Sequence, residues 1–226
     1  MAVIKEHLPS HLQKVEKAGI DEVFLVWPLL KADGADDLMN ALRSHARRIV
    51  YLSAEAAGRR SDSFWREVEL AIERANCEWT FLRPTGFASN TLMWADQIRR
   101  SDVVRWAYGR AARSLIDERD IAAVAVKALL GADHTGERHV LSGPEALTQT
   151  DQVRLIGAAL GRNLRWEELP AEAIQDQLSG VPDSALNTWA SFVATPEVVT
   201  STVQEITGQQ ARPFAEWASD NAEAFR

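Results

Sequence analysis

Three short apolar segments, separated by stretches with helical spacing, constrain the fold of this chain most. They cover residues 23–27, 49–52 and 79–82. A turn residue follows each of them, namely Pro28, Ser53 and Pro84. Unbroken apolar runs of this length are typical of strands buried on both faces. Alternating with helices, they predict a parallel sheet in an α/β domain, with a ligand site beyond the carboxyl ends of the strands.

The rest of the chain predicts further helices and short strands. Apolar residues at helical spacing predict helices at about 9–18, 36–46, 64–77, 119–131, 148–160 and 170–178. Short strands are expected at 103–109, 139–141 and 164–166, and the polar segment Ala56–Asp62 is expected to be a mobile loop. From Pro182 onward the pattern is helical. We expect a Rossmann-like core over 1–147 and a mainly helical part over 148–226 within the same compact unit.

Composition excludes several classes of function. The chain has 226 residues, a net charge of -7 and 25% charged residues, so no basic surface for nucleic acid is indicated. No apolar run approaches the roughly 18 residues that would span a membrane. A single cysteine and the absence of a signal-peptide pattern favour a reducing, cytoplasmic location.

Metal and hydrolase sites are not indicated either. The histidines occur as two pairs, His7 with His11 and His134 with His139. A metal site needs three or four converging ligands, and no suitable partner lies at the required spacing, so we expect no metal. No G-x-S-x-G nucleophile elbow is present.

The order of several motifs resembles a known family. The segments 19–26, 48–53 and 79–87 are followed by Glu118-Arg119-Asp120-Ile121-Ala122, by Leu141-Ser142-Gly143-Pro144 and by residues 156–162. This succession is similar to that of the NmrA-like atypical short-chain dehydrogenases. The resemblance covers about residues 19–169 and implies a Rossmann-type fold that binds NADP or NAD. Members of that family include quinone reductases, azo-dye reductases and redox-sensing regulators without turnover.

The resemblance also implies site residues. Those expected to contact the cofactor are Trp27, Pro28, Ser53, Ala54, Pro84, Gly86 and Phe87. Those expected to line a substrate pocket are Glu55, Trp65, Asn90 and Arg119. Structural explanations remain open for several of them. Ser53 also suits a strand-end turn, Pro84 a strand end, and Arg119 with Asp120 the start of a helix.

Two family features are missing from the sequence. No G-x-G-x-x-G turn for a diphosphate is present, and the chain is expected to start near the family's third strand. The sheet would then retain a contiguous set of strands, with Val23–Trp27 as an exposed apolar edge. We expect this edge to pair in a homodimer or to be covered by Ala2–Glu6.

The Tyr-x-x-x-Lys dyad of the wider superfamily is also absent. The aligned segment is Ser61-Asp62-Ser63-Phe64-Trp65, and neither Tyr51 nor Tyr108 has a lysine four residues later. Two hypotheses remain. One is an NAD(P)H-dependent oxidoreductase for a small quinone-like or carbonyl acceptor, with impaired dinucleotide binding. The alternative is a cofactor-independent isomerase or cyclase, or a regulatory partner-binding module.

Overall fold

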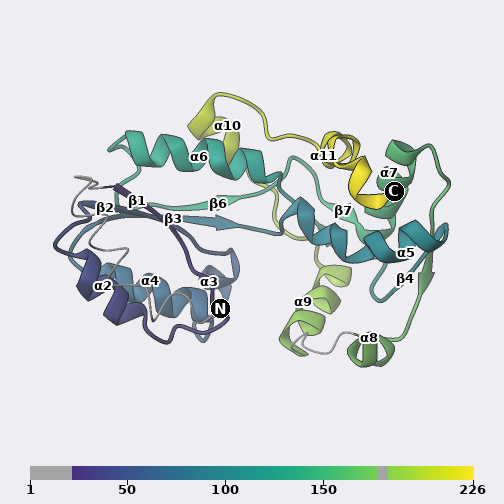
Figure 1. The fold of residues 1–226 in the computed structure, drawn as a ribbon, viewed down its shortest axis with the longest axis horizontal. Helices are drawn as coiled ribbons and strands as arrows, with labels where there is room; N and C mark the ends of the chain where they lie inside the picture. The colour runs from purple at the N-terminus through teal and green to yellow at the C-terminus, as the bar shows by residue number, and fades with distance from the viewer. Residues whose placement is uncertain (1–21, 178–182) are drawn as a thin grey trace. The chain divides into compact units, whose positions relative to one another are not determined.

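The computed structural model describes residues 22–177 and 183–226 (Figure 1). Contacts divide the chain into two compact units. Unit 1 combines 1–84 with 122–140, and unit 2 combines 85–121 with 141–226. The sequence instead placed one boundary after residue 147. The observed boundaries differ because the chain passes from unit 1 into unit 2 after its third strand. Residues 122–140, which contain most of one helix and one strand, then belong to unit 1 again. That the parts fold as a single unit stays a prediction.

Unit 1 contains the parallel sheet predicted from the apolar segments. Its strands are β1 (Glu22–Val26), β2 (Arg48–Leu52), β3 (Glu78–Pro84) and β6 (Arg138–Leu141), in the order β1-β2-β3-β6. The pairs β1–β2 and β2–β3 are parallel. Phe81 N donates to Glu137 O, and four residues later Thr85 N donates to Leu141 O, also four residues later. The two segments therefore run in the same direction, and β6 is parallel to β3. The predicted sheet and its consecutive strand order are confirmed.

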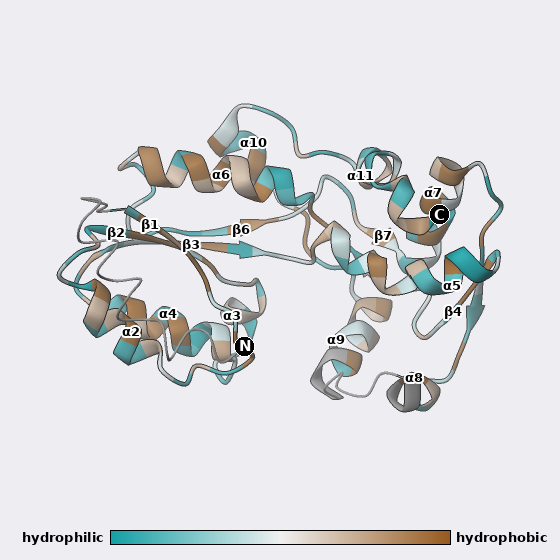
Figure 2. Cartoon of the chain, viewed as in Figure 1, coloured by the Kyte–Doolittle hydropathy of each residue, from teal (hydrophilic) through white to brown (hydrophobic). Residues whose placement is uncertain are grey.

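Helices cover both faces of this sheet. On one face lie α2 (Ala35–Leu42), α3 (Ala56–Arg59) and α4 (Phe64–Arg74), and on the other lies α6 (Glu118–Leu130), which belongs to unit 1 from Ala122 onward (Figure 1). Brown, hydrophobic residues run along the strands between these helices (Figure 2). The prediction of a loop over 56–62 is wrong for its first four residues. Buried Ala57 and an ion pair between Glu55 and Arg59 stabilise α3, a short helix that its Gly and Arg content concealed.

A buried arginine joins α6 to the sheet. Arg48 of β2 donates from Nη1 to the carbonyl oxygens of Leu129 (3.0 Å) and Gly131 (2.6 Å). Its Nε and Nη2 donate to Glu78 Oε2. The guanidinium therefore satisfies carbonyl groups at the end of α6 that have no partner within the helix. These bonds stabilise the carboxyl end of α6, which the sequence predicted to lie at about residue 131.

Unit 2 holds two small sheets and most of the remaining helices. In it β4 (Val103–Trp106) pairs in parallel with β8 (Arg165–Glu168), and β5 (Ala112–Arg113) pairs antiparallel with β7 (Leu147–Thr148). The helices are η1 (Ala88–Trp94), α5 (Ala95–Arg100), α7 (Gln149–Leu160), α8 (Ala171–Gln177), α9 (Asp183–Ala194), α10 (Thr202–Thr207), α11 (Phe214–Asp220) and η2 (Ala222–Phe225). Both ends of α7 are capped: the Thr148 side chain accepts from Asp151 N, and Gly161 ends the helix with φ of 66°.

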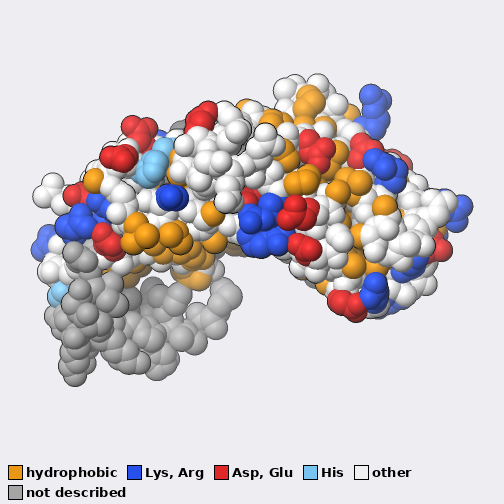
Figure 3. All heavy atoms as spheres, turned by 90° about the horizontal axis from the view of Figure 1, so that it is seen from above, with side chains coloured by type: hydrophobic (Ala, Val, Ile, Leu, Met, Phe, Trp, Pro, Cys, Tyr) orange, Lys and Arg blue, Asp and Glu red, His pale blue; other side chains and the backbone are white. Residues whose placement is uncertain are grey.

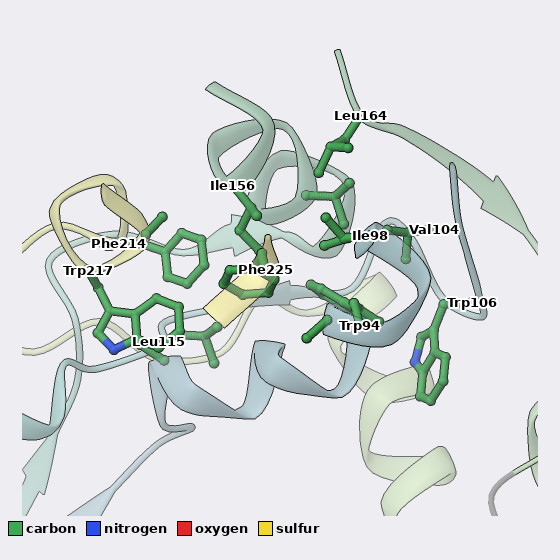
Figure 4. Packing of buried hydrophobic residues seen from close by; sticks show 14 of the residues in the cluster. Trp94, Ile98, Val104, Trp106, Leu115, Ile156, Leu164, Phe214, Trp217 and Phe225 are labelled. Atoms are coloured by element: carbon green, nitrogen blue, oxygen red, sulfur yellow. The ribbon is translucent and has the colours of Figure 1, made fainter. Parts of the chain in front are cut away.

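Aromatic side chains dominate the core of unit 2. Trp94, Trp217, Phe214 and Phe225 converge there with aliphatic residues of α5 and α7 (Figure 4). Three of the eight tryptophans in the chain, Trp94, Trp106 and Trp217, are at most 3% exposed in this cluster. These residues serve packing.

The surface shows no segregation of charge in the view of Figure 3, where acidic and basic side chains are interspersed. Within 22–177 and 183–226, no helix has the length and apolar character needed to cross a membrane.

Candidate functional site

The carboxyl ends of β2 and β3 stay paired beyond the strands. Ser53 N donates to Leu82 O (2.8 Å), and Glu55 N donates to Pro84 O (2.9 Å). The structure therefore brings Ser53, Ala54, Glu55 and Pro84 together at the edge of the sheet where a parallel α/β fold places ligands.

A buried carboxylate lies directly behind this edge. Glu69 of α4 is 0% exposed, and its two oxygens accept four hydrogen bonds. Ser53 Oγ donates to Oε1 (2.7 Å), and Arg83 donates from Nε to Oε1 (2.9 Å) and from Nη2 to Oε2 (2.7 Å). Arg66 Nη1 adds a bond to Oε2 (3.2 Å). Burial of this charge is compensated by two guanidinium groups and one hydroxyl.

The hydrogen bond to Glu69 changes the interpretation of Ser53. Its hydroxyl hydrogen is used by the carboxylate, and the residue is almost completely buried. Ser53 thus supports the carboxylate network in addition to ending β2. Whether it also contacts a cofactor stays a prediction.

The network extends from Glu69 across the surface of unit 1. Arg66 Nη1 also donates to Glu73 Oε1 (3.0 Å), which accepts from Arg138 Nη2 (2.6 Å). The Arg138 guanidinium lies over the Trp79 ring, 4.5 Å from its centre. Partial burial of Glu73 opposes ionisation, but the hydrogen bonds from Arg138 and Arg66 hold the pKa of Glu73 below its ordinary value.

Tyr51 lies in the same part of the core and has an unsatisfied hydroxyl. Its side chain is fully buried, and its OH has no hydrogen-bond partner among the described residues. Burial raises the pKa of Tyr51, and the negative charge of Glu69 raises it further. Tyr51 is therefore a neutral phenol at physiological pH.

The other predicted site residues of unit 1 have local partners. Trp27 donates from Nε1 to Lys31 O (2.8 Å) in the loop after β1, and Pro28 in that loop is exposed. Trp65 packs against Phe64, with ring centres 4.1 Å apart. These contacts are local and do not reach the strand ends at Ser53 and Pro84, and the proposed roles of Trp27, Pro28 and Trp65 stay predictions.

In unit 2, the segment after β3 is held in an extended conformation. Ile116 N donates to Gly86 O (2.8 Å), Ala88 N donates to Ile116 O (2.9 Å), and Phe87 forms a parallel bridge with Ile116. The backbone of the predicted residues Gly86 and Phe87 is thereby fixed.

A second buried ion pair lies against Gly86. Arg113 donates from Nε to Glu197 Oε2 (3.2 Å) and from Nη2 to Oε1 (3.0 Å), and its guanidinium lies 5.2 Å from the centre of the Phe192 ring. Glu197 also accepts from Ser114 N (3.2 Å). A Cβ on Gly86 would lie 2.6 Å from Arg113 Nη2, so only glycine allows this approach. Sequence reasoning missed Arg113 and Glu197, because they are 84 residues apart and form no motif.

The predicted residues Asn90 and Arg119 lie on the surface of unit 2. Asn90 is exposed in η1. Arg119 forms ion pairs with Asp117 (2.6 Å) and Asp220 (2.8 Å). Partial burial opposes ionisation of Asp117, but the hydrogen bonds from Arg119 hold the pKa of Asp117 below its ordinary value. These contacts favour the structural explanation for Arg119, and its role in a substrate pocket stays a prediction.

The start of α2 adjoins a mainly acidic cavity. The helix that follows β1, α2, begins after Gly34, whose φ is 87°, and no side chain caps it. This geometry can bind phosphate. However, the adjoining cavity of about 290 Å³ is lined by Asp33, Asp36 and Glu67, with Arg74 as its one basic residue. The surplus of negative charge opposes a diphosphate there, and at α4 the helix start is already capped by Ser63.

No group of three or more His, Cys, Asp or Glu side chains that could hold a metal ion is found in the described part of the chain.

Comparisons with known proteins identify close relatives. No protein-family model matches the chain. It is 38% identical over 219 residues to the (4-alkanoyl-5-oxo-2,5-dihydrofuran-3-yl)methyl phosphate reductase of Streptomyces griseus, covering 92% of this chain and 78% of that protein. It is 31% identical over 222 residues to the NAD(P)H azoreductase of Xenophilus azovorans, covering 92% and 77%.

Solved structures share the fold. The NADPH-dependent quinone oxidoreductase of Escherichia coli matches with a TM-score of 0.73 and 21% identity, over 92% of this chain and 79% of that one. The triphenylmethane reductase of Citrobacter matches with a TM-score of 0.75 and 15% identity, over 93% and 79%. Both have also been solved with NADPH or NADP(H).

The parallel sheet, its helical layers and these relatives define a Rossmann-like protein related to reductases. The chain belongs to the NmrA-like family of atypical short-chain dehydrogenases/reductases, as the order of its motifs predicted.

Proposed function

We propose that this chain is an NmrA-like, NAD(P)H-dependent oxidoreductase-type protein for a small quinone-like or carbonyl acceptor. The observation that carries the proposal is the 38% identity, over nearly the whole chain, to a reductase. The name of that relative's substrate contains an alkanoyl and an oxo group, and the second relative is an NAD(P)H azoreductase. In unit 1, Ser53, Ala54 and Pro84 at the carboxyl edge of β2 and β3 would contact the cofactor. In unit 2, Gly86 and Phe87 would provide a wall of the acceptor site.

We further propose that this chain binds a dinucleotide weakly. The start of α2 faces Asp33, Asp36 and Glu67, and no glycine-rich turn is present in the sequence. We therefore expect this chain to lack the main-chain amides that usually bind a diphosphate.

Titration of the purified protein with NADPH, followed by fluorescence and by thermal shift, tests both statements. We expect no saturation below about 1 mM NADPH, together with slow reduction of p-benzoquinone at higher concentrations. Saturation in the micromolar range would contradict weak binding. Absence of NADPH-dependent reduction across a panel of quinones, enones and azo compounds would contradict the oxidoreductase. It would favour the cofactor-independent isomerase, cyclase or regulatory module, which the absence of a glycine-rich turn from the sequence also favours.

The exposed strand β1 supports a proposal on assembly. Among the described residues, β1 has β2 as its one neighbour in the sheet, and Phe24 and Val26 are 40% and 56% exposed. We propose that two copies pair through this edge, because open apolar strand edges associate readily. The alternative cover, Ala2–Glu6, lies outside the described residues.

Light scattering coupled to size-exclusion chromatography tests the dimer. We expect the wild-type protein to elute as a dimer and Phe24→Lys as a monomer, with exposed Leu92→Lys in unit 2 as the matched control. A monomeric wild-type protein over the micromolar range would contradict the proposal.

A further inference from the structure

We propose that Arg113 binds a carbonyl oxygen of the acceptor through its Nη1 nitrogen, and so selects for acceptors that carry one. The proposal deepens the proposed function and rests on it for the identity of the acceptor. It concerns a residue that neither the sequence motifs nor the comparisons indicate.

The first argument is that the Arg113 guanidinium is held rigidly. Two of its nitrogens bond to Glu197, whose side chain is 3% exposed, and the Phe192 ring covers the group at 5.2 Å. Ser114 N fixes the carboxylate in turn (3.2 Å). A hydrogen-bond donor that is already oriented loses little conformational entropy when a ligand binds.

The second argument is that one nitrogen of this group is available. Among the described residues no acceptor bonds to Arg113 Nη1. Solvent reaches Nη1, although the Arg113 side chain as a whole is only 16% exposed. Nη1 therefore presents N–H donors at the surface of an otherwise buried group.

The third argument is position. Arg113 lies against Gly86, where a Cβ would come within 2.6 Å of Nη2 and 2.9 Å of Cζ. Gly86 and Phe87 are the residues that we propose as a wall of the acceptor site. An acceptor that contacts this backbone thus lies next to the Arg113 guanidinium.

The charge of the pair selects the chemistry of the ligand. Glu197 neutralises Arg113, so the pair carries no net charge to attract a free anion. A partly desolvated guanidinium N–H still donates strongly to a neutral oxygen. The pair therefore suits a ketone, lactone or quinone oxygen better than inorganic phosphate.

Side-chain NMR of ¹⁵N-arginine-labelled wild-type protein tests the proposal without any cofactor. The Arg113 guanidinium signals are assigned by their absence from Arg113→Lys. We expect γ-butyrolactone to shift these signals in a saturable way and tetrahydrofuran, which has the same ring without the carbonyl, to bind two- to tenfold more weakly. Equal effects of the two compounds, or no shift with either, would overturn the proposal. A shift with inorganic phosphate but not with the lactone would also overturn it.

Variants test the proposed contact between Arg113 and the carbonyl oxygen independently of folding and of the proposed oxidoreductase activity. We expect Arg113→Lys to weaken lactone binding measured by ligand-detected NMR, and Arg105→Lys, whose exposed pair with Glu167 lies in the same unit, to leave it unchanged. Equal binding by Arg113→Lys and wild type would contradict the inference. If Arg113→Lys does not fold, triple-resonance NMR of the wild-type protein assigns the Arg113 signals, and the wild-type titration decides alone. NADPH-dependent turnover does not enter either readout, so failure of the oxidoreductase and failure of this contact are distinguishable.

Discussion

The two units contain similar ion pairs with different environments. In unit 1 Arg83 bonds to Glu69, and in unit 2 Arg113 bonds to Glu197, each through Nε and Nη2. Both carboxylates are buried, and each guanidinium lies close to a glycine. The difference lies in what else each group contacts.

In unit 1, Gly58 lies next to Arg83 Nη1, the guanidinium nitrogen that does not bond to Glu69. A Cβ on Gly58 would lie 3.0 Å from Arg83 Nη1, so α3 lies beside that nitrogen. In unit 2 the glycine faces Nη2, which Glu197 already holds, and Nη1 stays available. The first pair joins α4 to the strand ends, and we propose that the second orients a hydrogen-bond donor for a ligand.

Removal of Glu69 should give the largest effect. Glu69→Ala leaves Arg83, Arg66 and the Ser53 hydroxyl without their buried acceptor, so we expect a loss of about 3–5 kcal/mol in unfolding free energy. Urea denaturation measures the loss. Glu67→Ala, an exposed position on the same helix, is the control, and a comparable loss there would contradict the role of Glu69.

Removal of Glu197 should cost less. Glu197→Ala frees one guanidinium, which can turn toward water, and one backbone amide, so we expect a loss of about 1.5–3 kcal/mol. The same denaturation series gives the value. If Glu197→Ala lost more unfolding free energy than Glu69→Ala, the expected ranking of the two ion pairs by stability would be wrong.

The two glycines should respond differently to alanine. Gly86→Ala places a Cβ 2.6 Å from Arg113 Nη2 and 2.7 Å from Leu115 Cδ2, and overpacking of this kind costs about 1–3 kcal/mol. Gly58→Ala meets only the end of the Arg83 side chain and gains about 1 kcal/mol of helix propensity, so we expect little net change. Equal destabilisation by the two substitutions, measured by thermal unfolding, would remove this distinction.

Tyr51→Phe should stabilise unit 1 slightly. The hydroxyl is buried without a partner near the negative Glu69, so its removal relieves a desolvation cost of about 1 kcal/mol. Denaturation of the variant at neutral pH tests this. A clear loss of stability would mean that the hydroxyl has a bonding partner.

Acid should weaken the outer part of the unit 1 network. The pKa of Glu73 is lowered in the folded state, so its contribution is fully present above the unfolded value of about 4.3 and is lost as pH falls through the folded value. The stability difference between wild type and Glu73→Gln should therefore be constant above about pH 5 and shrink below it. A difference that does not change between pH 6 and pH 3 would contradict the lowered pKa, and Glu67→Gln serves as the control.

Local patterns in the sequence were sufficient for the strands of the main sheet and for several helices, but they did not predict β5, β7, η1 or α5. The buried segments 23–27, 49–52 and 79–82 have the length and composition of parallel strands, and Thr148 with Gly161 marks both ends of α7. The same reasoning failed at α3, where stability comes from burial of Ala57 and a single ion pair rather than from propensity.

The parallel sheet, the NmrA-like family and the absence of a glycine-rich turn could be predicted from the amino-acid sequence, because they depend on residues that are close together in the chain. Which charges are buried together became evident only from the folded structure. Ser53, Glu69 and Arg83 come from three elements, and Arg113 meets Glu197 across 84 residues. Such pairs form because each buried charge needs a partner, and the fold, not the local sequence, brings that partner within reach.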